Sequence, residues 1–516
     1  MNVGRTCRVV TALLPVTMAA CADRPLPVEP GGGGYLESAI AAGAPDSVSN
    51  RWIVLFRDDV TEPATLAQQL IAAHGGHAIH FYEHVVKGFA VANLPDAAVV
   101  SLRANPVVRL VEESLLVPQT AVQYLPLDNY NYQTSSLWSL DRVHVRPLSF
   151  DGQFEYGYTG SGVHIYILDS GIRCTHQEFA GRIGEGVTRL SWSLGASPCI
   201  DQDGHGTGVA SSAGGTTYGI AKGAILHPVR INDNGDAYCD DIVAGFDWVG
   251  GNAIRPAVAN LSYGGVPFCF SVRDAMEGVI AAGIVVTKSA GNDPYDAYDD
   301  RANRAANAII VGASDYYDRR ATFSNGLATY GYLITVFAPG YQVRVAWKDH
   351  DGDNAVADGS SFSAPYVAGV AATYLQQNPS ASPTAVLDII RSAATNDVLS
   401  NIGPGSANRF LHTSFRSVAI SGPSSIASDV ESTYSWTSQT TGGSASSYVW
   451  EISINGGSFS TVSTTNSYSR TIYPGESYDF ELRLTAVIAG DPRTDNHFVR
   501  VIPPPEEPPC APGEMC

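Results

Sequence analysis

The chain has few basic residues, no long apolar run and no cysteine motif of the kind that holds a metal. Its 31 Lys and Arg stand against 50 Asp and Glu, and the resulting net charge of -19 disfavours binding to nucleic acid. Apart from a short stretch near the N-terminus, no apolar run could cross a bilayer. No CxxC pair or Cys/His cluster with zinc spacing occurs among its 8 cysteines. With 516 residues, the chain is expected to fold as several water-soluble domains.

The first residues have the pattern of an export signal. Arg5 and Arg8 precede an apolar stretch that ends in small residues, which predicts a signal peptide over residues 1–21. Two cleavage modes stay open, because the sequence MAAC ending at Cys21 resembles a bacterial lipobox while the same small residues suit an ordinary signal peptidase. Contact with a membrane is expected only through a lipid on Cys21. Residues 22–50 are rich in Pro, Gly and Ala and are expected to be a linker.

Residues 51–120 change their hydrophobic periodicity in a regular order. Short apolar runs alternate with two amphipathic stretches in the order βαββαβ, which predicts a ferredoxin-like α+β domain. The expected strands are 52–56, 77–82, 88–94 and 107–111, and the expected helices are 64–74 and 96–103. This fold alone does not identify a function.

Residues 121–415 alternate short apolar strands with helical stretches. This order predicts an α/β domain with a parallel sheet that helices cover on both faces, and such sheets carry their chemistry at the carboxyl ends of the strands. Residues 416–502 are rich in Ser, Thr, Tyr and Gly, and their short alternating strands predict an immunoglobulin-like β-sandwich with Trp436 and Trp450 in its core. The Pro-rich residues 503–516 are expected to form an extended tail.

Four polar side chains lie where such a sheet presents its chemistry. Asp169 follows a buried apolar strand, and His205 lies between two glycines at the start of an apolar helix, where its ring edge stays open. Asn292 follows another strand, and Ser361 opens a helix whose free N–H groups and dipole can stabilise an oxyanion. Taken singly, each is more often a cap, a turn residue or a structural histidine. Together, in the order Asp, His, Asn, Ser, they predict nucleophilic catalysis by a serine.

The sequence around these four residues resembles the signature blocks of the subtilases, a family of serine proteases. The matching segments are Asp169-Ser170-Gly171, Gly204-His205-Gly206-Thr207, Asn260-Leu261-Ser262-Tyr263-Gly264-Gly265, Ala290-Gly291-Asn292 and Gly359-Ser360-Ser361. Segments 138–143, 311–315 and 321–325 are similar to the proteinase K-like branch, and 51–113 resembles the inhibitory propeptide of the family. The resemblance implies a subtilisin-like fold and an exported serine endopeptidase that works through an acyl-enzyme.

The resemblance also implies a role for each residue. Ser361 attacks the scissile carbonyl, His205 moves the proton, and Asp169 orients the imidazole. Asn292 and the backbone N–H of Ser361 bind the oxyanion. The residues expected to bind the substrate are Ser262, Tyr263, Gly264, Ala290 and Gly291. No cofactor is expected for catalysis, and the substrates are expected to be proteins or peptides, with a broad preference for apolar or aromatic side chains.

By the same resemblance, the segment QTAVQ at residues 119–123 is the junction between propeptide and mature enzyme, and autocleavage is expected near Thr120. Residues 51–120 would then be the enzyme's own inhibitor, and residues 121–415 its catalytic domain. A monomer is expected. If Cys21 is lipidated, the cut would free the enzyme from its membrane.

Several residues depart from the family pattern. The family has histidines where this chain has Gly208 and Tyr366, so altered packing behind the catalytic residues is expected. Ser360 and Phe362 replace a threonine and a methionine beside the nucleophile. Lys288 lies on a core strand and needs a buried partner, because an unpaired buried charge is costly.

Two further expectations concern the region near the site. Residues 300–305 replace a Pro-Ala segment that the family uses near its specificity pocket. Asp315 matches a calcium ligand of proteinase K-like enzymes, so a structural calcium ion at Asp315 is a hypothesis, with an ordinary surface acid as the alternative. The disulfides that the resemblance implies are Cys199–Cys239, Cys174–Cys269 and Cys510–Cys516.

Two other functions fit the same residues. A catalytically weakened subtilase homologue could act as a surface-binding protein through its β-sandwich, and an esterase or a peptide ligase could use the same triad. Labelling with a fluorophosphonate separates the first alternative from an active protease, since only an activated serine reacts.

Overall fold

The computed structural model describes most of the chain. It covers residues 50–503 apart from 118–123, 126–136, 147, 149, 151, 153, 155, 191–192, 194–195, 234, 265–268, 324–325, 416, 442–443 and 489–490. The predicted signal with Cys21, the junction at 119–123 and the Cys510–Cys516 pair lie outside the described residues. Among the helices that are described, none has both the length and the apolar character needed to cross a membrane.

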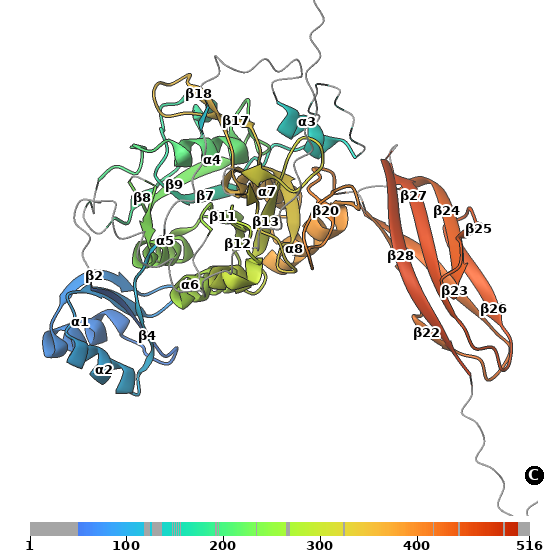
Figure 1. Cartoon of the computed structure of the whole chain (residues 1–516), viewed down its shortest axis with the longest axis horizontal. Coiled ribbons are helices and arrows are strands. Elements are labelled where there is room, and N and C mark those ends of the chain that lie inside the picture. The colour runs from blue at the N-terminus through green and yellow to red at the C-terminus, as the bar shows by residue number, and fades with distance from the viewer. Residues whose placement is uncertain are drawn as a thin grey trace, which may run out of the picture. The chain divides into compact units, whose positions relative to one another are not determined.

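The N-terminal domain is a four-stranded antiparallel sheet with two helices (Figure 1). Its elements are β1 Arg51–Phe56, α1 Pro63–His74, β2 His77–Tyr82, β3 Gly88–Ala92, α2 Asp96–Ala104 and β4 Val108–Glu113. The sheet order β2-β3-β1-β4 is that of a ferredoxin-like unit, so the predicted βαββαβ order is confirmed. Because alternate residues of a strand face opposite sides, Val54 and Phe56 pack in a core with α1 and α2, while Ile53 and Leu55 join the core of the next domain.

The second domain is built on a nine-stranded sheet of order β19-β20-β16-β13-β12-β11-β7-β9-β8. All neighbouring pairs are parallel except β19 and β20. The strands are β7 His164–Asp169, β8 Val187–Thr188, β9 Ile225–Arg230, β11 Ala257–Leu261, β12 Val285–Ser289, β13 Ile309–Ser314, β16 Val336–Pro339, β19 Thr395–Asn396 and β20 Arg409–Phe410. The predicted α/β fold class is confirmed, and the central strands are buried except for His164 at the start of β7, as expected of a sheet covered on both faces.

Helices cover this sheet as two packed pairs, α4 with α7 and α5 with α6 (Figure 1). The helices of the domain are α3 Trp138–His144, α4 His205–Gly214, α5 Cys239–Asn252, α6 Phe270–Ala281, α7 Ser360–Gln377 and α8 Pro383–Ala393. Short elements complete it: η2 Gln177–Phe179, η3 Ala297–Asp299, η4 Arg301–Arg304, β5 Leu116–Val117, β6 Tyr124–Leu125, β10 Ala237–Tyr238, β14 Thr322–Phe323, β15 Gly326–Leu327, β17 Val343–Ala346 and β18 Asn354–Ala357. Strands β7 and β12 and helices α4 and α7 are the elements that position the predicted site.

The C-terminal region contains two sheets of orders β21-β23-β26 and β22-β28-β27-β24-β25. Their strands are β21 Ser417–Ser421, β22 Ser425–Ala427, β23 Ser432–Thr441, β24 Ala445–Ile454, β25 Ser460–Ser463, β26 Ser467–Ile472, β27 Asp479–Ile488 and β28 Asp491–Ile502. Residues of both sheets share one core, in which Trp436 and Trp450 are fully buried. The predicted sandwich and its two core tryptophans are therefore confirmed.

The disulfides differ from the expected pairing. The bridges are Cys174–Cys199 and Cys239–Cys269, with Cα–Cα distances of 5.1 and 6.4 Å, so the expected Cys199–Cys239 and Cys174–Cys269 pairs were wrong. Cys239 opens α5 and Cys269 caps α6, and these helices begin side by side because parallel strands lead into both from the same edge of the sheet.

Candidate active site

Asp169 and His205 form a buried pair at the carboxyl edge of the sheet. Asp169 is the last residue of β7, and His205 is the first residue of α4. His205 Nδ1 lies 2.7 Å from Asp169 Oδ1, and neither side chain is exposed. Burial lowers the pKa of His205, but the charge and hydrogen bond of Asp169 outweigh it, so the pKa lies above the usual value. The structure therefore brings this predicted pair together.

Asp201 joins the two segments that carry this pair, although the sequence analysis did not single it out. One of its oxygens accepts hydrogen bonds from Ser170 Oγ at 2.9 Å and Gly204 N at 2.7 Å. The other accepts from both the N–H and the hydroxyl of Thr207. Asp201 therefore caps the start of α4 and ties it to the loop after β7. The sequence feature that could have identified Asp201 is an acid a few residues before the expected start of a helix.

Ser361 lies in the first turn of α7 and is buried. Its hydroxyl donates to the carbonyl oxygen of Ser262 at 3.0 Å. His205 Nε2 is buried and has no hydrogen-bond partner among the described residues. The Phe362 ring packs edge-on against the imidazole at 5.4 Å between centroids. The Phe362 contact places the helix start that carries Ser361 beside the His205 ring, while the Ser361 hydroxyl itself is bonded to Ser262.

Asn292 lies against the start of α7. Asn292 Oδ1 accepts hydrogen bonds from Ser360 N at 2.8 Å and Ser360 Oγ at 2.7 Å, which fixes the amide orientation. Gly359 has a φ of +142°, and a Cβ built on it would lie 3.1 Å from Asn292 Nδ2 and 3.6 Å from Ser361 N. The space beside Gly359 is therefore within reach of two N–H donors, which is the geometry of an oxyanion hole.

The predicted substrate residues lie in two neighbouring segments. Ser262 Oγ donates to the Ser361 carbonyl at 2.7 Å, so this side chain holds the backbone at Ser361. Tyr263 is buried, and its hydroxyl donates to the Gly235 carbonyl at 2.9 Å. A Cβ on Gly264 would lie 2.5 Å from the Cα of Gly291, which places the two backbone segments in contact beside Ala290. Gly265 is outside the described residues.

The departures from the family pattern have local explanations. A Cβ on Gly208 would lie 3.0 Å from Phe362 Cε1, so the larger residue beside the nucleophile fills the space that Gly208 leaves. The Tyr366 hydroxyl lies 2.8 Å from Ser139 Oγ. The buried partner of Lys288 is Asp300, 2.9 Å from the ammonium. Burial lowers the pKa of Lys288, and the Asp300 carboxylate opposes that shift.

Asp315 is engaged by its own loop. One carboxylate oxygen accepts hydrogen bonds from Tyr317 N at 2.9 Å and Arg319 N at 3.0 Å. The other oxygen pairs with the Arg319 guanidinium at 2.7 Å. The carboxylate is satisfied by N–H donors, and this donor set does not fit a calcium ligand.

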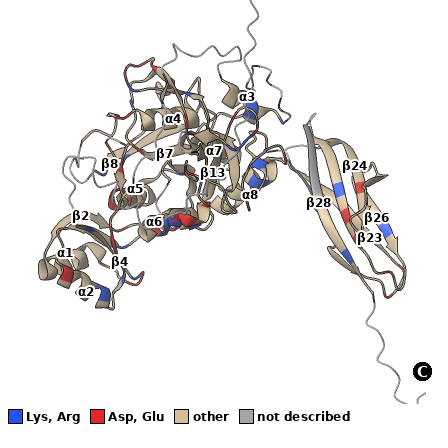
Figure 2. Cartoon of the chain, in the orientation of Figure 1, with Lys and Arg blue, Asp and Glu red and all other residues tan. Residues whose placement is uncertain are grey.

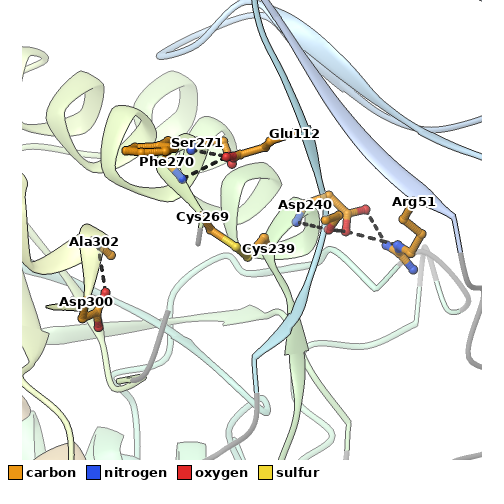
Figure 3. The surroundings of a disulfide bond; sticks show 10 residues. Arg51, Glu112, Cys239, Asp240, Cys269, Phe270, Ser271, Asp300 and Ala302 are labelled. Atoms are coloured by element: carbon orange, nitrogen blue, oxygen red, sulfur yellow. Dashed lines mark hydrogen bonds and ion pairs between the residues drawn. A yellow bond between two sulfur atoms is a disulfide. The ribbon is translucent and has the colours of Figure 1, made fainter. Parts of the chain in front are cut away.

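The N-terminal domain contacts the second domain through buried charges. Figure 3 shows Arg51 directed at Asp240, and its Nε lies 3.2 Å from Asp240 Oδ1. His80 Nε2 lies 2.6 Å from Asp241 Oδ1. Burial and the neighbouring Asp240 raise the pKa of Asp241 to about 6. His80, Asp240 and Asp241 lie close enough to hold a metal ion, but the Arg51 guanidinium already supplies a cation there.

A carboxylate of the N-terminal domain caps helix α6. Glu112 accepts hydrogen bonds from Phe270 N at 3.1 Å and Ser271 N at 2.8 Å (Figure 3). Figure 2 shows acidic residues on α5 and residues of both signs on α6. The Cys239–Cys269 disulfide joins the starts of these two helices, so it holds together two of the places where the N-terminal domain binds.

Comparison with known proteins places this geometry in a family. Residues 160–411 match the model of the Subtilase family. The chain is 35% identical over 421 residues to the extracellular serine proteinase of Thermus sp. (strain Rt41A), covering 78% of this chain and 97% of that protein. It is 34% identical over 383 residues to alkaline serine exoprotease A of Vibrio alginolyticus, covering 72% of this chain and 69% of that protein.

Solved structures agree with the fold. A cold adapted subtilisin-like serine proteinase is 33% identical, with a TM-score of 0.51, and the match covers 54% of this chain and 99% of that one. Fervidolysin from Fervidobacterium pennivorans, a keratinolytic enzyme related to subtilisin, is 17% identical with a TM-score of 0.55. That match covers 87% of this chain and 76% of the other, and it supports the fold alone.

Proposed function

Because this chain belongs to the subtilase family of serine-type proteases, we propose that Ser361, His205 and Asp169 are its catalytic triad and that it cleaves proteins as an exported endopeptidase. Subtilases need no cofactor for catalysis. The observation that carries the proposal is the meeting of the His205–Asp169 pair, 2.7 Å apart, with the helix start that bears Ser361.

The chemistry begins with rotation of the Ser361 side chain from the Ser262 carbonyl to His205 Nε2. Ser361 Oγ then attacks the scissile carbonyl carbon while its proton moves to Nε2, and Asp169 stabilises the imidazolium that forms. Asn292 Nδ2 and the Ser361 N–H bind the oxygen that becomes negative. Collapse of this intermediate breaks the C–N bond, and the amine leaves with the proton from Nε2. Water attacks the acyl-enzyme by the same route and releases the acid.

The N-terminal domain acts as an inhibitory propeptide in this proposal. It buries its charges against α5 and α6, where Arg51 pairs with Asp240 and Glu112 caps the start of α6. A cut near Thr120 leaves these noncovalent contacts in place, so the cleaved propeptide is expected to stay bound as an inhibitor until it dissociates or is degraded. We place the cut near Thr120.

Export is supported by the N-terminal pattern and by relatives named as extracellular proteinases. A lipid on Cys21 would stay with the propeptide, so the cut would release the enzyme from a membrane. Fractionation of a Ser361→Ala variant tests this step, because a soluble, unlipidated variant excludes it.

Comparison of purified wild type with Ser361→Ala tests the proposed function. Mass spectrometry is expected to find a mature N-terminus near Thr120 in the wild type and the uncut propeptide in the variant. The wild type is expected to degrade an unfolded protein substrate, and the variant is not. A wild type that stays uncut and leaves the substrate intact would favour the catalytically weakened, surface-binding homologue instead.

A further inference from the structure

The Lys288 ammonium is the centre of a fully buried polar cluster that contacts residues 290–292, the segment that includes Asn292. Lys288 lies on the central strand β12, and its side chain is 0% exposed, with Asp300 and Asn303 each 1% exposed. Nζ donates to Asp300 Oδ2 at 2.9 Å, Asn303 Oδ1 at 2.8 Å and the Ser289 carbonyl at 3.0 Å. An ammonium has three N–H groups, so these three acceptors use all of them.

Asn303 connects Lys288 to the backbone by hydrogen bonds. Lys288 holds its Oδ1, which turns Nδ2 to the opposite side. Nδ2 then donates to the carbonyls of Ala290 and Ala297, each at 3.1 Å. The orientation of the Asn303 amide is therefore set by Lys288, and the Ala290 peptide is held by Asn303.

The same short segment is held from the other side by the start of α7. Ser360 Oγ accepts from Gly291 N at 3.2 Å and lies 3.0 Å from the Gly291 carbonyl oxygen. Ser360 N and Oγ both donate to Asn292 Oδ1. Residues 290–292 are thus fixed between a buried cation cluster and the helix that carries the nucleophile.

We propose that Lys288 is a positioning residue of this protease, which acts through Asn303 and the Ala290 carbonyl to hold the Asn292 amide at the oxyanion. Residues 300–303 supply the carboxylate and the amide that allow a lysine in the core of the sheet. The inference rests on the proposed role of Asn292. It predicts that the cluster changes turnover more than substrate affinity, because an oxyanion donor acts mainly in the transition state.

The test is the Asn303→Asp variant of the full-length protein, assayed on a peptide p-nitroanilide. The new carboxylate keeps an oxygen for Lys288 and replaces the Nδ2 donor to Ala290 by an acceptor. We expect kcat to fall by roughly 10- to 100-fold with KM little changed, which is the scale of a small misplacement of a catalytic group. If Lys288→Met folds, it should show the same fall in kcat with KM little changed. If it does not fold, the kcat of Asn303→Asp decides whether the cluster positions the site.

Asn408→Asp is the matched control, because Asn408 Nδ2 donates to the Leu399 carbonyl at 2.9 Å and Oδ1 accepts from Leu399 N at 3.0 Å outside the site. This control should keep the wild-type kcat. A wild-type kcat in Asn303→Asp, or an equal loss of kcat in both variants, overturns the role of Lys288 and leaves the proposed function unaffected. A folded wild type that no fluorophosphonate labels overturns the proposed function, and this inference with it.

Discussion

Adding one methyl group at Gly359 should remove most of the activity. The new Cβ would lie 3.1 Å from Asn292 Nδ2 and 3.6 Å from Ser361 N, in the space that the oxyanion of the substrate needs. Loss of one oxyanion donor lowers kcat by about 10²- to 10³-fold, and Gly359→Ala obstructs two donors, so we expect a loss at or above the upper end of that range. Because Gly359 has a φ of +142°, an alanine there is strained, and we expect the variant to be less stable by about 1–3 kcal/mol.

Stability and catalysis are separated by a second alanine variant. Gly283 has a φ of +85°, and a Cβ on it would meet nothing within 4 Å, so Gly283→Ala carries backbone strain without blocking the site. We expect both variants to melt at lower temperature and only Gly359→Ala to lose kcat, measured per folded molecule on a peptide p-nitroanilide. Wild-type kcat in a folded Gly359→Ala protein would refute the assigned oxyanion geometry.

Two further predictions concern proton transfer and inhibition. His205 must be neutral to accept the Ser361 proton, and Asp169 raises its pKa, so kcat/KM should be lost as the pH falls through a midpoint above about 6.5. A midpoint below that value in the pH profile would contradict the Asp169 contact. Glu112→Gln removes the charge that caps α6, so the isolated propeptide should inhibit the mature enzyme roughly 10-fold more weakly, by titration of activity. Glu113→Gln, at an exposed position of the same strand, should inhibit like the wild type.

The order of elements was predictable because apolar periodicity is local. Strand β2 and helix α1 lie within two residues of the positions that their periodicity indicated. The short sequences around Asp169 and His205 also identified a pair that the structure places 2.7 Å apart. Both results depend on patterns a few residues long, which a single sequence carries in full.

What the sequence left open depends on contacts between distant segments. Cys239 pairs with Cys269 because two helices begin side by side, and no local pattern reports that register. Lys288 pairs with Asp300 because the loop after β12 brings the carboxylate to the ammonium, and no periodic pattern in the sequence indicates that contact. The rotamer of Ser361, which donates to Ser262 instead of His205, is likewise a property of the folded site.

The central claim is that Ser361 is activated by His205 and Asp169. The most direct measurement is mass spectrometry of the mature protein after reaction with a fluorophosphonate. The account predicts one adduct, on the peptide that contains Ser361, with none in Ser361→Ala and far slower labelling in His205→Ala. A folded wild type that remains unlabelled, or that carries the adduct on another residue, would contradict it.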